Sequence, residues 1–292
     1  MELTHILIRD RRHEARGLPA LVRENTASFA RAHPGLAQRI WGRGEIRELL
    51  RQRFSAEVLR AFDALRPYAY QADLARYCLL HESGGIYADV SYCLLHPLPI
   101  AAGKPVVFRD FLWSSPWDAS NGLFFMPPRH AALARAIEMV CANVQHSYYG
   151  ATALCPTGPA LFGKALASTC EAEDLITGSA VKMEAKAVRR LCPGLSLPAS
   201  PAIHCLTLGE RVVAIKRKPF GAAGLRDIGV TGGNAYGEMW KRREVYAPGG
   251  ADEAGPDLSR AVSPWQALGL LSVGVLGVAA WLAQGREDGR ED

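Results

Sequence analysis

The sequence predicts an α/β domain built on a parallel sheet, followed by a transmembrane helix near the C-terminus. Short β-branched or aromatic runs alternate with stretches of helical apolar spacing, which predicts the domain. An uncharged apolar run close to the end predicts the membrane helix. The chain has 292 residues, of which 49% are apolar and 22% charged. This composition is ordinary for a globular protein, and the length allows a substantial core.

The N-terminal part alternates strand and helix patterns. Leu3 to Ile8 is expected to form a strand, and "LPALVRENTASFARAHPG" has the spacing of a helix that stops at Pro34 and Gly35. "AQRIW" then predicts a strand and "EIRELLRQRF" a helix. Because ligands of parallel α/β sheets usually bind beyond the carboxyl ends of the strands, functional residues are expected at those ends.

A buried helix and a strand are predicted next. In "YAYQADLARYCLLHES", Tyr70 and Leu74 begin an apolar face at helical spacing. Gly84 and Gly85 follow, where a helix commonly ends in the left-handed conformation. "IYADV" is β-branched and aromatic, as strands are. Asp89 is therefore expected near the carboxyl end of a strand.

The following region continues with strand and helix signals. "PVVFRDF" and "NGLFFM" predict strands, separated by the loop "LWSSPWDAS", and a helix is expected from about His130 to Val144. Thr157 and Gly158 are predicted to lie in a turn before a short helix. "RVVAIK" predicts a late strand, whereas the rest of residues 171–217 gives no clear topology.

The C-terminal segment changes in character. Residues 1–247 are expected to form the folded domain, 248–263 a linker, 264–284 a transmembrane tail anchor and 285–292 a short polar tail. Ala267 to Ala283 carry no charge over 17 positions, and Trp265 and Trp281 lie near the edges. The alternative is a buried C-terminal helix. With no signal peptide recognised, we expect a single-pass membrane protein whose domain lies in the cytosol.

Charge and cysteine content exclude several functions. The net charge of +5 comes largely from segments such as "RDRRHEARG", which are typical of a solvated face. No basic motif interleaved with aromatic residues indicates a nucleic-acid partner. The seven cysteines are scattered without C-x-x-C spacing, which argues against a zinc site and a disulfide framework.

The candidate chemistry lies around one helix and one strand. Asp73 and Arg76 are three residues apart, so they share a helix face and can reach a common ligand. The alternative is a surface ion pair worth about 0.2–0.5 kcal/mol. Asp89 alone is explained equally well as the polar end of a strand. The combined order favours a site: Asp-x-x-Arg-Tyr on a helix, a Gly-Gly turn, a tyrosine and Asp89.

The stretch "ADLARYCLLHESGGIYADVSY" resembles the sugar-binding region of the D-x-D glycosyltransferases. That family includes fungal outer-chain α-1,6-mannosyltransferases, inositolphosphorylceramide mannosyltransferases and bacterial capsular polysaccharide glycosyltransferases. The matching positions are Asp73, Arg76, Tyr77, Gly84, Gly85, Tyr87 and Asp89. Ser91 stands where the family has its second acid. "SNGLFFM" and "CPTGPALF" resemble two further segments and add Asn121, Thr157 and Gly158.

The resemblance implies a single Rossmann-like nucleotide-sugar-binding domain of the glycosyltransferase A type. It implies a retaining hexosyltransferase that uses a UDP- or GDP-sugar and a saccharide or lipid-linked acceptor at the membrane. Asp73 and Arg76 would hold sugar hydroxyls, and Asp89 would contact the donor and a metal ion. The implied substrate-binding residues are Tyr77, Gly84, Gly85, Tyr87, Ser91, Asn121, Thr157 and Gly158.

Metal binding and activity each leave alternatives open. By the resemblance, Asp89 would hold Mn²⁺ or Mg²⁺, which prefer oxygen ligands. A neutral hydroxyl is a poorer cation ligand than a carboxylate, so Ser91 calls for another acid, such as Asp110 or Asp118, to complete the shell. The alternative activities are a mannosyltransferase acting on an inositol phosphate sphingolipid and an inactive donor-binding scaffold.

Overall fold

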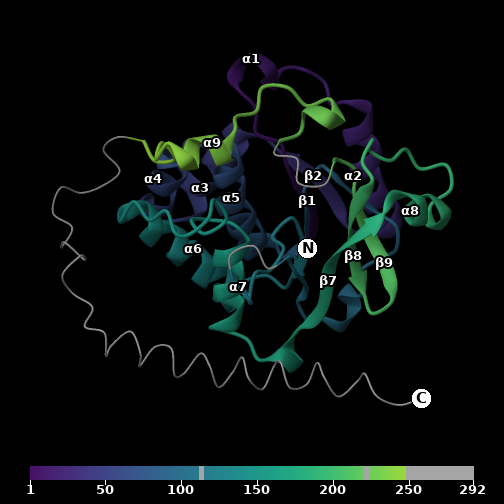
Figure 1. Cartoon of the computed structure of the whole chain (residues 1–292). Coiled ribbons are helices and arrows are strands. Elements are labelled where there is room, and N and C mark those ends of the chain that lie inside the picture. Colours follow the sequence, from purple (N-terminus) through teal and green to yellow (C-terminus); the bar gives the residue numbers. More distant parts are fainter. Residues whose placement is uncertain (112–114, 220–223, 248–292) are drawn as a thin grey trace. The chain divides into compact units, whose positions relative to one another are not determined.

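The computed structural model describes residues 1–111, 115–219 and 224–247, and a nine-stranded sheet forms its centre (Figure 1). The strand order is β2-β1-β3-β6-β5-β7-β8-β9-β4. The strands are β1 (Glu2–Ile6), β2 (Ala37–Trp41), β3 (Gly85–Ala88), β4 (Tyr92–Leu94), β5 (Val106–Arg109), β6 (Leu123–Met126), β7 (Ile176–Glu184), β8 (Ala202–Leu208) and β9 (Arg211–Lys216). The helices are α1 (Arg11–Glu14), α2 (Ala20–Ala32), α3 (Arg43–Arg53), α4 (Ala56–Ala64), α5 (Tyr68–Ser83), α6 (Ala131–Gln145), α7 (Pro159–Ala167), α8 (Ala185–Leu191) and α9 (Tyr236–Lys241).

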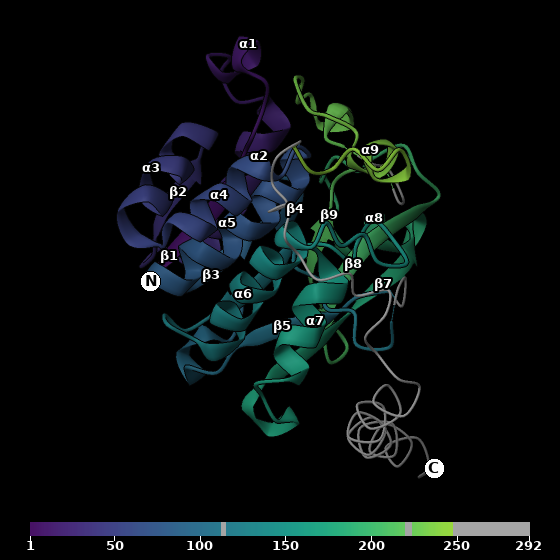
Figure 2. The same ribbon diagram turned by 90° about the vertical axis from the view of Figure 1, so that its left-hand side faces the viewer.

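Helices cover the two faces of the sheet, and side-chain alternation along the strands explains how. Tyr87 of β3 and Phe124 of β6 belong to the core that includes residues of α3 to α7. Ile86 and Phe125, their chain neighbours, belong to the other core, together with Phe29 of α2. Successive strand residues point to opposite faces, so β3 and β6 contribute to both cores. Figure 2 shows α3 to α7 gathered on one side.

The sheet is mixed, so the expectation of a parallel sheet is wrong. β1 pairs in parallel with β2 and β3, and β5 with β7. The pairs β3–β6, β5–β6, β7–β8, β8–β9 and β4–β9 are antiparallel. Parallel neighbours need a crossover of a dozen or more residues, usually a helix, whereas β8 and β9 are joined by a two-residue hairpin at Gly209 and Glu210.

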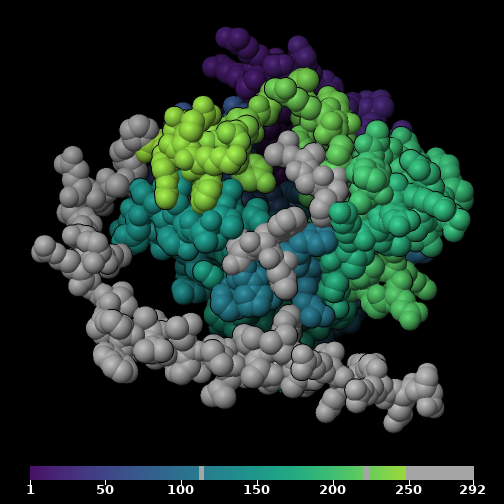
Figure 3. Space-filling view, in the orientation of Figure 1, coloured from purple at the N-terminus to yellow at the C-terminus, as the bar shows by residue number. Residues whose placement is uncertain are grey.

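The sheet also curls. β4 is the last strand in the spatial order, beside β9, yet in the chain it follows β3 after only residues 89–91. Three residues bridge little more than 10 Å, so the β4–β9 edge must come back towards β3. This curl brings the end of β9 close to the end of β3. On the face drawn in Figure 3, the region of β7 to β9 and α8 lies on one side and α9 on the other.

Most of the elements expected before residue 170 are confirmed, with shifted ends. The strands around residues 3–8, 37–41, 86–90, 105–111 and 121–126 are β1, β2, β3, β5 and β6, and "RVVAIK" is β9. The helices α2, α3, α5, α6 and α7 also occur where their patterns predict them. The sequence did not predict α1, α4, α8, α9, β4, β7 or β8. β7 contains Gly178, at which an added Cβ would lie 2.2 Å from the carbonyl oxygen of Thr207.

The predicted membrane helix, and with it the membrane localisation, is corrected. In the part of the chain that the structure describes, no helix is long and apolar enough to cross a bilayer. The longest of them, α5, has 16 residues and carries Asp73 and Arg76. It spans about 24 Å, short of a hydrocarbon core of about 30 Å. The segment 264–284, on which the prediction was based, lies outside the described residues, as do the predicted linker and tail.

A two-glycine turn joins α5 to β3, as the sequence predicts. Gly84 ends the helix at φ 58°, and Gly85 begins the strand at φ 118°. A Cβ on Gly85 would lie 2.1 Å from the carbonyl oxygen of Glu2 on β1. Both the dihedral angle and the close approach of β1 therefore require glycine at position 85.

We expect Gly85→Ala to lower the free energy of unfolding by about 2–4 kcal/mol, because it adds backbone strain and a collision with β1. Urea unfolding followed by circular dichroism measures the change. Gly44→Ala is the matched control: Gly44 lies in α3, and an added Cβ meets no atom within 4 Å. An unchanged stability of Gly85→Ala would contradict the packing described for this turn.

Candidate active site

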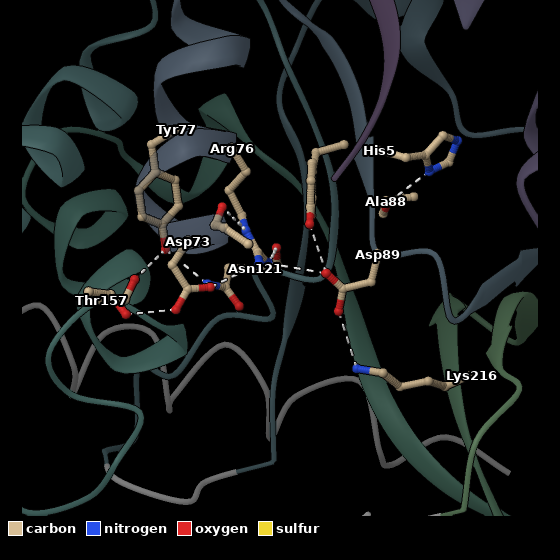
Figure 4. Close-up of polar contacts among 11 residues, drawn as sticks. His5, Asp73, Arg76, Tyr77, Ala88, Asp89, Asn121, Thr157 and Lys216 are labelled. Carbon is tan, nitrogen blue, oxygen red and sulfur yellow. Dashed lines mark hydrogen bonds and ion pairs between the residues drawn. The ribbon is translucent and has the colours of Figure 1, made fainter. Parts of the chain in front are cut away.

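Four elements bring polar side chains together at the carboxyl end of β3 (Figure 4). α5 supplies Asp73 and Arg76, and Asp89 follows directly after β3. Asn121 precedes β6, and Thr157 precedes α7. The antiparallel pairing of β3 with β6 places the start of β6 beside the end of β3, with Ala88 opposite Leu123. The sequence-distant residues therefore meet at one edge of the sheet.

Asp73 is the buried end of this cluster. Its Oδ1 accepts a hydrogen bond from Asn121 Nδ2 at 2.8 Å, and its Oδ2 accepts one from the Thr157 hydroxyl at 2.7 Å. Arg76 Nη2 lies 3.0 Å from Oδ1. The Tyr77 hydroxyl accepts a second hydrogen bond from Asn121 Nδ2 at 3.0 Å and donates to the Thr157 carbonyl at 2.8 Å. Both carboxylate oxygens of Asp73 are thus held in place.

Arg76 connects the buried carboxylate to the more exposed one. Its Nη1 lies 3.4 Å from Asp89 Oδ1 and donates to the backbone carbonyl of Asn121. Its guanidinium carbon lies 4.4 Å from the centre of the Tyr87 ring. A buried guanidinium is costly unless it is paired and hydrogen-bonded, and here two carboxylates, the backbone carbonyls of Ala72 and Asn121 and an aromatic face supply its partners.

Asp89 is the end of the cluster that is open to solvent. Its side chain is 27% exposed, compared with 11% for Asp73 and 6% for Arg76. Oδ1 accepts a hydrogen bond from the Tyr87 hydroxyl at 2.9 Å, and Oδ2 lies 3.6 Å from Lys216 Nζ. A Cβ on Gly122 would lie 2.9 Å from Oδ2, so glycine at position 122 leaves room for the carboxylate.

The two carboxyl groups differ in their electrostatics. Burial opposes ionisation of Asp89, but Arg76, Lys216 and the Tyr87 hydrogen bond outweigh it and hold its pKa below the ordinary value. Burial raises the pKa of Asp73, and the opposing effects of Arg76 and the Thr157 hydrogen bond do not cancel it. The more exposed carboxyl is therefore the more strongly ionised one. It is available to accept hydrogen bonds from a ligand.

The structure brings most of the expected site residues together, but not all of them. Asp73, Arg76, Tyr77, Tyr87, Asp89, Asn121 and Thr157 form one connected set. A Cβ on Gly158 would lie 3.6 Å from Asp73 Oδ2, so this glycine borders the set. Gly84 and Gly85 lie at the opposite end of β3 and contact Pro128 and Glu2. Ser91 is fully buried, and its hydroxyl is without a hydrogen-bond partner among the described residues.

Two contributors were not predicted from the sequence. Lys216, the last residue of β9, reaches Asp89 through the curl of the sheet. His5 of β1 donates from Nδ1 to the carbonyl of Ala88 at 2.8 Å, while its Nε2 lies 3.0 Å from Gln38 Nε2. Burial lowers the pKa of His5 to about 4, which keeps the ring neutral and suits this pattern. The only sequence signal for Lys216 is its position at the end of a strand.

The residues do not fit a divalent metal ion as they lie. In the described ranges no group of three or more His, Cys, Asp or Glu side chains is placed to hold one. Asp110 and Asp118, expected to complete a metal shell, accept hydrogen bonds from the Phe111 N–H and the Ser115 hydroxyl. Asp89 has two cations within 4 Å. Mn²⁺ or Mg²⁺, which the sequence led us to expect, needs several oxygen ligands, and the described residues do not gather them here.

Comparison with known proteins finds a family match and similar proteins. Residues 19–107 match the family described as the glycosyltransferase sugar-binding region containing a DXD motif. An uncharacterized glycosyltransferase of Acanthamoeba polyphaga mimivirus is 33% identical over 73 residues, which make up 25% of this chain and 29% of the viral protein. The chain thus matches less than a third of that relative. Among solved structures, the PaToxG glycosyltransferase is similar with a TM-score of 0.43 and 15% identity, over 57% of this chain and 67% of the other.

Over the matched stretch, the chain is similar to glycosyltransferases. Residues 19–107 are the part that is similar to DXD-containing sugar-binding regions. They include Asp73, Arg76 and Asp89, with Ser91 at the second acidic position of the motif. Asn121, Thr157 and Lys216 lie beyond the match, and only the fold relates them to it.

The pH dependence of stability should reveal the buried environment of Asp110. Burial raises the pKa of Asp110 to about 6, against about 3.9 in an unfolded chain. The protonated carboxyl is favoured in the folded state, so its contribution to stability is fully present below about pH 4 and is lost as the pH rises through about 6. We expect Asp110→Asn to raise the free energy of unfolding by about 1–2 kcal/mol at about pH 7.5 and to change it little at about pH 4. Urea unfolding at both pH values measures this, and an equal change at both would contradict the raised pKa.

Proposed function

We propose that the protein is a retaining glycosyltransferase that moves a hexose from a nucleotide-diphosphate sugar to a saccharide or lipid-linked acceptor. One observation carries the proposal: within the family-matched stretch, Asp73, Arg76 and Asp89 form a continuous ion-paired chain that ends in a partly exposed carboxylate. Retention of the configuration at C1 of the hexose is proposed from the family resemblance.

The arrangement suits the binding of a sugar. Carboxylates accept hydrogen bonds from hydroxyl groups, and a guanidinium donates several in a fixed geometry. Asp73 and Arg76 are locked by Asn121, Thr157 and the Tyr87 ring, so they need little further ordering when a donor binds. In the proposed complex, Asp89, which is ionised and partly exposed, contacts the donor hexose or its ribose.

The reaction requires stabilisation of the negative charge that develops on the leaving nucleoside diphosphate. The bond between C1 of the hexose and the phosphate oxygen breaks, and its electron pair remains on the nucleoside diphosphate. Positive groups placed beforehand near that oxygen lower the barrier, because they need no reorganisation as the charge develops. Lys216 and Arg76 are the cations that flank Asp89.

The proposal covers more than one acceptor and more than one donor. A mannosyltransferase acting on an inositol phosphate sphingolipid is one form of it, and UDP- and GDP-sugars are both candidate donors. A donor-binding scaffold without transfer is the second candidate function. The observation in its favour is Ser91, a buried hydroxyl at the second acidic position of the motif.

We expect Asp89→Asn to reduce hexose transfer or donor hydrolysis by about 100-fold or more, because it removes the exposed negative charge between two cations. Radiolabelled UDP- and GDP-hexoses, offered to the purified full chain, measure the rate. Asparagine is nearly isosteric and can still accept from the Tyr87 hydroxyl, so the variant should fold.

Asp63→Asn is the matched control, since it makes the same substitution at a carboxylate that pairs with Arg47 on the surface. It should transfer at the wild-type rate. Equal rates for Asp89→Asn and the wild type would contradict the proposed site. Donor binding without turnover in either protein would favour the scaffold.

A further inference from the structure

Lys216 lies opposite Asp89 across the end of the curled sheet. In the antiparallel pairing of β4 with β9, Lys216 is the register partner of Tyr92. Its Nζ lies 3.6 Å from Asp89 Oδ2 and 4.8 Å from the centre of the Tyr92 ring. Figure 4 shows its side chain reaching towards Asp89 from the side away from Arg76. The carboxylate is therefore held between two cations.

The ammonium group lies in a sheltered but accessible position. The Lys216 side chain is 18% exposed and Asp89 is 27% exposed, so a ligand that reaches the carboxylate also reaches the amine. The Tyr92 ring and the strand backbone restrict the side chain. An ammonium held in this way binds phosphate as a point charge and needs little ordering.

The neighbouring position of the motif offers no compensating acid. Ser91 stands there, 0% exposed, and its backbone carbonyl accepts the N–H of Arg217 at 2.8 Å. Two carboxylates, Asp73 and Asp89, balance the charge of two cations, Arg76 and Lys216, in this ion-paired set. A divalent cation added at Asp89 would be repelled by both neighbours and would find one carboxylate where several oxygen ligands are needed.

We propose that Lys216 performs, in this chain, the task of a divalent cation: its ammonium group binds the diphosphate of the nucleotide donor. This rests on the proposed function. When C1–O cleavage leaves the electron pair on the phosphate oxygen, Lys216 donates a hydrogen bond to the diphosphate and keeps its own proton. The acceptor oxygen forms the new bond to C1, and the acceptor proton is released to solvent. Asp89 keeps the amine oriented and protonated before the donor arrives.

Isothermal titration of the full chain with UDP and with GDP tests this, once in EDTA and once with excess MnCl₂. We expect at least one nucleotide to bind in EDTA, with a Kd within about threefold of the value in Mn²⁺. Lys216→Met should weaken that binding about tenfold or more, and Lys216→Arg, which keeps the charge, should recover most of it. Lys186→Met removes a lysine exposed on α8 and should bind as the wild type does.

The outcomes separate the two proposals. Binding that requires Mn²⁺, or Lys216→Met binding as tightly as the wild type in EDTA, overturns the role of Lys216 and leaves the glycosyltransferase proposal standing. Binding of neither nucleotide in either condition overturns the proposed function itself. Thermal melting without nucleotide checks that each variant folds. If Lys216→Met does not fold, the wild-type comparison in EDTA and in Mn²⁺ still tests the proposal, because binding that requires Mn²⁺ overturns it.

Discussion

The site depends on the pairing of one buried guanidinium. Arg76 lies within the protein, where an unpaired charge would cost several kcal/mol. Its partners come from three places: Asp73 on the same helix, Asp89 after β3, and the carbonyl of Asn121 before β6. The pairing therefore links α5 to the end of β3 and the start of β6. Removing either carboxylate would take away one of the two ion-pair partners of this buried charge, so the geometry of the site and the stability of the fold are coupled.

The curl of the sheet adds the second half of the site. Antiparallel hairpins after β7 return the chain to the edge that continues from β3, and β9 ends at Lys216 beside Asp89. A flat parallel sheet would hold the last strands far from the first. The mixed topology thus places a fixed cation opposite Asp89, the carboxylate that follows β3. The same closeness explains why Asp89 is ionised although it is partly buried.

Local patterns predicted the elements that contain the motif, and their failures have physical causes. Helical spacing around Tyr70 and the glycine pair after it located α5 and β3, because both signals arise within a few residues. The antiparallel pairings were missed because strand patterns carry no information on direction. Asp73 and Arg76 could equally have formed a weak surface pair, and their burial, with Thr157 on Asp73 and the Tyr87 ring against Arg76, is a property of packing.

The sequence by itself determined that Asp73 and Arg76 share a helix face, that glycine ends this helix, and that Asp89 follows the next strand. Those relations follow from helix and strand periods and from the dihedral angles that glycine allows. Only the tertiary structure decided that the pair is buried, that Asn121 and Thr157 hold Asp73, and that Lys216 faces Asp89. Contacts between residues so far apart in the chain depend on the sheet order and its curl, because no local period relates them.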